Sequence, residues 1–157
     1  MKFMRHRSVA VVVLLIVIAL VYRYGYLIRG GVGRELEIQA REHTLQPFRL
    51  TDIAAFSWER VIFLGPYDNQ AVADRALGFH WPDFRLLGLE SSDSFSLIVF
   101  VHDENVVRAE KVGRCRPDFA KELVGGAVPR ANATFAIENT GDCRVLKLAN
   151  ELPATSR

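Results

Sequence analysis

Residues Phe95 to His102 read FSLIVFVH, and this stretch decides the fold that the sequence predicts. Apolar residues occupy both sets of alternating positions, which is typical of a strand covered on both faces. Asp103-Glu104-Asn105 supplies a tight turn, and Val106 to Val112 follows as a more exposed partner strand. The stretch therefore predicts a hairpin within a mostly antiparallel sheet.

Two further segments extend this sheet. Trp58 to Leu64 (WERVIFL) is rich in β-branched and aromatic residues and stops at Gly65-Pro66, where Gly65-Pro66-Tyr67 would turn into a helix. Thr134 to Glu138 and Cys143 to Leu148 predict a second hairpin, joined through Asn139 to Asp142. The residues expected to line the core are Val61, Phe63, Leu97, Val99, Phe100 and Val101.

The helix signals in the domain are short. Asp68 or Asn69 can cap a helix that runs to Leu77, with Val72 and Ala76 on one face and Gly78 closing it. Pro117 suits the first turn of a second helix, in which Phe119 and Leu123 pair before Gly125-Gly126. Hairpin strands with two or three short helices between them predict an α+β fold.

The N-terminal run from Val9 to Tyr22 (VAVVVLLIVIALVY) carries no charge, and Lys2, Arg5 and Arg7 precede it. A membrane-spanning helix needs roughly twenty residues, and this run reaches that length through Ile28 if Arg23 snorkels to the interface. A short run also fits a cleavable signal peptide. A signal-peptide cleavage site needs small residues, but the residues after the run are bulky and basic. This favours an uncleaved anchor in contact with lipid through residues 9–28.

The chain divides accordingly into four parts. Residues 1–29 are expected to form the anchor with a short cytoplasmic N-terminus, and residues 30–47, which begin with Gly30, Gly31 and Gly33, a stalk or linker. Residues 48–150 would form the extracytoplasmic domain and residues 151–157 a flexible tail. Basic residues on both sides of the run make the orientation nearly a tie, and the cysteine pair favours the oxidising side for the domain. The expectation is a single-pass protein of a bacterial inner membrane with its C-terminal domain in the periplasm.

The two cysteines, Cys115 and Cys143, are expected to form a disulfide, which would staple the second predicted helix to the sheet. Two independent buried thiols are the alternative. Arg114 and Arg116 flank Cys115 and would lower the pKa of a free thiol there, which would make it reactive.

The segment from Trp58 to Tyr67 has the pattern W-E-x-V-x-F-x-G-P-Y, and Leu77-Gly78-Phe79-His80-Trp81 follows it. Together with the hairpin after Leu97, it resembles small extracytoplasmic domains of uncharacterised bacterial membrane proteins and lipoproteins. The resemblance covers about half of the chain and implies compartment and fold. It supplies no catalytic residues, and this chain lacks the lipobox such proteins usually carry.

No spacing in the sequence predicts a metal, cofactor or nucleotide site. None of the four histidines lies four residues from another, and His102-Asp103 at the end of the central strand is the most suggestive pair. An envelope hydrolase using these residues is the alternative to a binding protein. The acids that could supply a catalytic carboxylate pair are Asp83, Glu90, Asp93 and Glu104.

The net charge of +2 leaves no basic stripe for nucleic acid once the residues beside the apolar run are set aside. Trp81 and Phe84 lie in a loop and predict a partner-binding surface with Tyr67, although the first two could also close the core. The favoured function is therefore non-enzymatic. It is a membrane-tethered periplasmic module that binds a protein or envelope component, as an immunity-type protein or as an accessory subunit.

Overall fold

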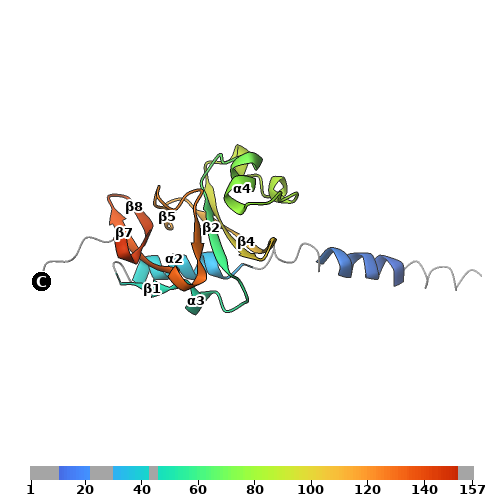
Figure 1. The fold of residues 1–157 in the computed structure, drawn as a ribbon, viewed down its shortest axis with the longest axis horizontal. Coiled ribbons are helices and arrows are strands. Elements are labelled where there is room, and N and C mark those ends of the chain that lie inside the picture. The colour runs from blue at the N-terminus through green and yellow to red at the C-terminus, as the bar shows by residue number, and fades with distance from the viewer. Residues whose placement is uncertain (1–10, 22–29, 43–45, 152–157) are drawn as a thin grey trace, which may run out of the picture.

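The computed structural model describes residues 11–21, 30–42 and 46–151 (Figure 1). Residues 30–151 hold a domain of the α+β class, as the sequence predicted. Its helices are α2 (Val32–Glu42), α3 (Leu50–Ile53), α4 (Gln70–Leu77) and the single-turn 3-10 helices η1 (Phe84–Leu87), η2 (Leu89–Ser91), η3 (Arg130–Asn132) and η4 (Ala149–Glu151). Its strands are β1 (Phe48–Arg49), β2 (Arg60–Leu64), β3 (Phe95–His102), β4 (Asn105–Gly113), β5 (Asp118–Phe119), β6 (Ala127–Pro129), β7 (Thr134–Thr140) and β8 (Cys143–Leu148).

The strands form two four-stranded sheets rather than one. The central sheet has the order β4-β3-β2-β6, and all its pairs are antiparallel. The outer sheet has the order β1-β7-β8-β5, in which only β5 runs parallel to its neighbour. Both predicted hairpins are confirmed, β3–β4 in the central sheet and β7–β8 in the outer one.

Strand β3 is covered on both faces, as its sequence predicted. Ile98 and Phe100 pack on the side of the outer sheet and α2, whereas Leu97, Val99 and Val101 pack on the side of α4 and η1. Figure 1 shows the central sheet lying between these two layers. The residues expected to line the core are all fully buried: Val61, Phe63, Leu97, Val99, Phe100 and Val101.

Helix α4 begins and ends where the sequence placed it. The Asn69 side chain accepts a hydrogen bond from the Val72 backbone N–H at 3.1 Å, and Gly78 closes the helix with a φ of 81°. The fully buried face is one residue away from the expected one, because Ala73 and Leu77 are buried while Val72 and Ala76 are half-buried.

Helix α2 corrects the expected stalk at residues 30–47. Val32, Leu36 and Ala40 recur every four residues and are buried in the core beside the outer sheet. Gly33 lies so close to β4 that a Cβ there would meet the Lys111 carbonyl oxygen at 3.0 Å. The domain therefore starts before Phe48, and α2 is part of it.

The second predicted helix, from Pro117 to Gly125, is wrong. Backbone N–H groups of this segment form hydrogen bonds to neighbouring strands instead. The Ala120 N–H donates to the Leu146 carbonyl oxygen at 2.9 Å, and the Gly125 N–H donates to the Phe63 carbonyl oxygen at 2.8 Å. Phe119 is nevertheless buried, and its ring meets the Phe63 ring edge-on at 4.8 Å between centroids. The apolar spacing identified a buried segment but not its conformation.

Residues 11–21 are helical. Within the described ranges, no helix combines the length and apolar character needed to cross a membrane. The rest of the predicted anchor, residues 1–10 and 22–29, lies outside the described residues, as does most of the predicted tail at 151–157.

Candidate functional site

A cleft of about 690 Å³ opens where the two sheets meet. Its walls come from β1 and α3, from the segment leading into β2, and from β6 and η3. The residues that line it are Arg49, Thr51, Trp58, Glu59, Pro129, Arg130, Ala131, Ala133 and Thr134. Two arginines and one glutamate give the cleft charges of both signs, which suits a polar or charged ligand better than an apolar one.

Arg130 holds one wall of this cleft together. Its guanidinium donates to the Trp58 carbonyl oxygen at 3.2 Å and lies 5.1 Å from the Trp58 ring centroid. Its backbone N–H donates to the Glu59 carbonyl oxygen at 2.7 Å. Arg130 therefore fixes the segment that carries Glu59, while Arg49 is exposed at the other side of the cleft.

The predicted pair His102-Asp103 lies at the β3–β4 turn and gains a third member, Glu59. The His102 Nδ1 atom lies 3.4 Å from Glu59 Oε1 and 3.7 Å from Asp103 Oδ2. The Asp103 N–H donates to Glu59 Oε2 at 2.9 Å. These three residues are called the Glu59 triad below.

Glu59 was missed by sequence reasoning because it lies far from His102 in the chain. The antiparallel register of β2 and β3 pairs Arg60 with Val101, so the residue before β2 comes opposite the end of β3. The Glu59 N–H donates to the Val101 carbonyl oxygen at 2.8 Å and continues this ladder. A correct register between the two predicted strands would have placed Glu59 there.

A second histidine–carboxylate pair lies beside a smaller hollow of about 270 Å³. His80 Nδ1 lies 2.7 Å from Asp74 Oδ2, and the Trp81 N–H donates to Asp74 Oδ1 at 3.0 Å. Of the four acids considered from the sequence, Asp83 and Glu104 line this hollow. Of the other two, the Glu90 carboxylate accepts from the Gln70 N–H at 2.8 Å, and Asp93 lies beside Arg114, which donates to its backbone carbonyl oxygen.

We expect Asp74→Asn to lower the free energy of unfolding by about 1–2 kcal/mol at neutral pH, the range for charge-assisted hydrogen bonds at a partly exposed group. Burial raises the pKa of Asp74, but hydrogen bonds from His80, Trp81 and Gln70 outweigh it and hold the pKa below its usual range. A depressed pKa in the folded state stabilises the protein above the unfolded-state pKa and ceases to do so as pH falls through the folded-state value. Urea unfolding at several pH values checks this: the difference between variant and parent should shrink as pH falls below about 4. A difference that stayed constant would contradict the assignment.

The predicted partner surface is wrong for two of its three residues. Trp81 is 3% exposed and Phe84, the first residue of η1, is 0% exposed, and their rings lie 5.8 Å apart between centroids in the core between α4 and the central sheet. Tyr67 is 61% exposed, and Leu86 in η1, which the sequence did not single out, is 66% exposed. These two are the large hydrophobic side chains exposed on the described part of the domain.

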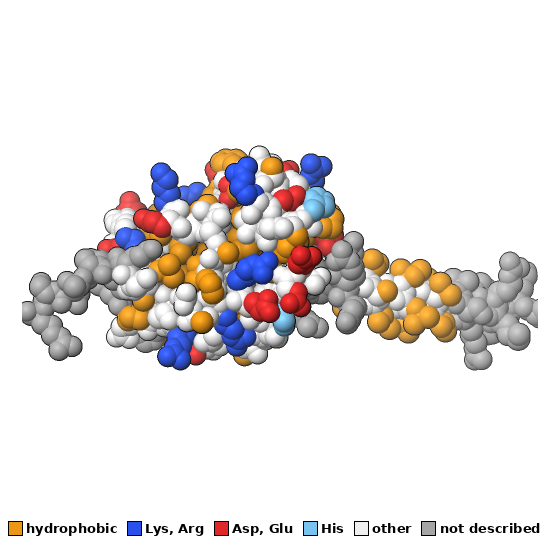
Figure 2. All heavy atoms as spheres, viewed as in Figure 1, with side chains coloured by type: hydrophobic (Ala, Val, Ile, Leu, Met, Phe, Trp, Pro, Cys, Tyr) orange, Lys and Arg blue, Asp and Glu red, His pale blue; other side chains and the backbone are white. Residues whose placement is uncertain are grey.

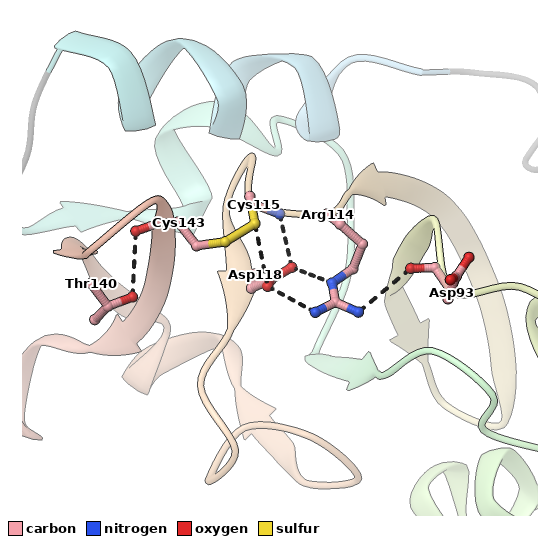
Figure 3. The surroundings of a disulfide bond; sticks show 6 residues. All are labelled: Asp93, Arg114, Cys115, Asp118, Thr140 and Cys143. Carbon is pink, nitrogen blue, oxygen red and sulfur yellow. Dashed lines mark hydrogen bonds and ion pairs between the residues drawn. A yellow bond between two sulfur atoms is a disulfide. The ribbon is translucent and has the colours of Figure 1, made fainter.

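Cys115 and Cys143 form the expected disulfide, with 4.5 Å between their Cα atoms. Figure 3 shows the Asp118 carboxylate beside it, accepting from the Cys115 N–H at 2.9 Å and from Arg114 Nε at 2.8 Å. The hydrogen bond to Asp118 raises the pKa of Arg114. The bridge joins the loop after β4 to the start of β8 and so ties the central sheet to the outer one, rather than stapling a helix. Neither cysteine is free, so Cys115 is not a reactive thiol in this structure.

Comparison with known proteins returned no matching family model, curated protein or solved structure.

Proposed function

We propose that the protein is a single-pass, membrane-tethered module whose domain lies in the periplasm and acts by binding another protein or an envelope component. The main support is the helix at 11–21, whose large hydrophobic side chains are 49–60% exposed. They are Val11, Val12, Val13, Leu14, Leu15, Ile16, Val17, Ile18, Leu20 and Val21. Figure 2 shows the visible side of this helix as hydrophobic throughout.

If a helix that is apolar all round packs one face on a domain, its other faces still expose apolar side chains to water. Exposed apolar area of this extent is typical of contact with lipid or with another protein. The uncharged sequence continues on both sides, from Val9 to Tyr22, and basic residues precede it. Lipid is the occupant that fits a helix without a polar face.

The compartment is proposed from the disulfide. Disulfide bonds persist in oxidising compartments such as the periplasm and are rare in the bacterial cytoplasm. With the N-terminus in the cytoplasm, a single span places the domain on the oxidising side.

A double substitution tests the tether. Leu15→Arg with Ile16→Arg should move the full chain out of the alkali-resistant membrane fraction, because each central arginine adds roughly 2.5–3.5 kcal/mol to insertion. Leu86→Arg is the matched control, since it makes the same change at a residue 66% exposed on the domain and should leave fractionation unchanged. Retention of the double variant in the membrane, or a mature chain that begins after Val21, would contradict a retained anchor.

Tyr67 supports binding as the task of the domain. It has a φ of 64°, a conformation that costs a bulky residue about 1–3 kcal/mol and that often occurs at functional sites. Its N–H donates to the Leu89 carbonyl oxygen at 3.2 Å, and the Gly65 N–H donates to Asp68 Oδ2 at 2.8 Å. These two hydrogen bonds fix the conformation of the turn. An exposed aromatic side chain on a fixed turn loses little entropy when a partner covers it.

Tethering strengthens this role, because confinement to a thin layer raises the effective concentration of the domain for partners at the same membrane. An immunity-type protein and an accessory subunit of an envelope complex both fit this arrangement. The second candidate is an envelope hydrolase. It is favoured by Glu59, whose carboxylate lies 3.4 Å from His102 Nδ1 and could orient that histidine as a general base.

A further inference from the structure

The Glu59 triad has the composition of a transition-metal site. One imidazole and two carboxylates come together from the segment before β2 and the β3–β4 turn, and their potential ligand atoms all lie within 4.8 Å of one another. Zinc is bound by histidine nitrogen and carboxylate oxygen, and sites that react or exchange ligands keep three protein ligands and one open position. Mg²⁺ and Ca²⁺ prefer oxygen alone, so the histidine favours a transition metal.

The two distances from His102 Nδ1 to the carboxylate oxygens also fit a bound ion. His102 Nδ1 lies 3.4 Å from Glu59 Oε1 and 3.7 Å from Asp103 Oδ2. Ligand atoms that hold zinc tetrahedrally at bond lengths of 2.0–2.2 Å are separated by about 3.3–3.6 Å. A direct hydrogen bond would bring the atoms closer, to about 2.7–3.0 Å. The spacing is therefore wider than the hydrogen bond expected for these groups and close to the edge of a zinc tetrahedron.

Among the described residues, the buried His102 Nδ1 atom has Glu59 Oε1 at an ion-pair distance of 3.4 Å but makes no hydrogen bond. Buried polar atoms almost always have a partner, and an unmet one calls for an ion, a water or a functional explanation. Glu59 is already oriented, since its Oε2 accepts from the Asp103 N–H at 2.9 Å and its Oε1 is the oxygen nearer His102. The same hydrogen bond fixes the turn from which the Asp103 carboxylate extends, with Asp103 at a φ of 52°.

Charge points the same way. Within residues 11–21, 30–42 and 46–151, no lysine or arginine forms an ion pair with Glu59 or Asp103. Arg130 in the cleft wall donates its Nη1 to the carbonyl oxygens of Phe56 and Trp58 instead. The Glu59 and Asp103 side chains, 50% and 79% exposed, are two acidic groups whose negative charge a divalent cation would balance.

We infer that Glu59, His102 and Asp103 bind a divalent transition-metal ion, with Zn²⁺ the ion that best fits the ligand set. The fourth position would be open to water. Glu59 also lines the cleft between the sheets, so the ion would lie at the margin of that cleft. The site does not depend on the proposed binding role and would exist whether or not the domain has a protein partner.

The His80–Asp74 pair provides a matched control. Its imidazole Nδ1 lies 2.7 Å from Asp74 Oδ2, a hydrogen-bond distance, and no group of three metal-ligating residues in the described chain includes it. It therefore contains the same two chemical groups without the third ligand and without the wider spacing.

The experiment is a titration of the full chain in detergent micelles with Co²⁺, followed by visible absorption, and then with Zn²⁺ as competitor. We expect one saturable site with the absorption bands of tetrahedral Co²⁺, displaced by Zn²⁺. His102→Ala and Glu59→Gln should each weaken binding by about tenfold or more, whereas His80→Ala and Asp74→Asn should not change it. Near-ultraviolet circular dichroism of each variant establishes that the fold is retained.

Three results would overturn the inference. They are no saturable binding by the parent chain up to 1 mM Co²⁺, equal affinity in parent and His102→Ala, or loss of binding in His80→Ala instead. Loss only in His43→Ala, a residue outside the described part of the chain, would likewise assign the ion to another site.

Discussion

Phe100→Ala should lower the free energy of unfolding by about 3–5 kcal/mol, the range for emptying a fully buried aromatic site. Phe100 is 0% exposed at the centre of β3, and its ring meets the rings of Phe56 and Trp58 edge-on at 5.0 and 5.3 Å between centroids. The substitution removes those contacts and leaves a cavity between the two sheets. Urea denaturation checks it, as a shift of the midpoint with little change in slope.

Phe95→Ala is the matched control for this substitution. Phe95 begins the same strand but is half-buried, with the Lys111 ammonium 4.2 Å from its ring centroid. Its truncation should cost clearly less than that of Phe100, because solvent already covers part of the site. A loss below about 1 kcal/mol for Phe100→Ala would contradict the placement of β3 between two layers.

Cys143→Ser should lower the free energy of unfolding by about 3–4 kcal/mol in the chain-entropy account of disulfides. The bridge closes a loop with a sequence separation of 28, and opening it restores conformational freedom to the unfolded chain. The difference between variant and parent should largely vanish when both are unfolded under reducing conditions. Two free thiols in protein isolated without reductant would contradict the bridge itself.

The strands could be predicted from the sequence because their signals are local. The run Phe95–His102 is apolar at both sets of alternating positions, and β3 is indeed buried on both faces. The division into two sheets could not be predicted, because it depends on which hairpins pair and on the short strands β1, β5 and β6. Those strands have two or three residues each, too few to carry a pattern.

The errors have separate physical causes. The buried stripe of α2 consists of Val32, Leu36 and Ala40 in an otherwise polar stretch, which is also the composition of a linker. Trp81 and Phe84 follow a helix that ends at a glycine, so the sequence predicts a loop there. The layer formed by α4 and η1 over the central sheet needs large side chains in its core, and these two residues supply them. The local sequence shows that a side chain is apolar, but it does not show which part of the fold will bury that side chain.

The candidate site was predicted in part for the same reason. His102 and Asp103 are adjacent in sequence and could be singled out together. Glu59 joins them only through the register of β2 and β3, and the cleft beside it needs both sheets in place. Sites assembled from distant segments leave no local motif. The absence of a motif in the sequence therefore does not argue against a metal or catalytic site at these residues.

The binding role is tested most directly by crosslinking and purifying the full chain from detergent-solubilised membranes and measuring how much of a stoichiometric partner it retains. We predict that Tyr67→Ala with Leu86→Ala reduces partner occupancy roughly tenfold or more, as expected for truncated anchors of an interface. The double variant His102→Ala with Asp103→Asn should retain the partner fully and keep its activity in cells. Unchanged partner occupancy in the correctly folded Tyr67 and Leu86 variant, with activity abolished in the His102 and Asp103 variant, would contradict the binding role and favour the hydrolase.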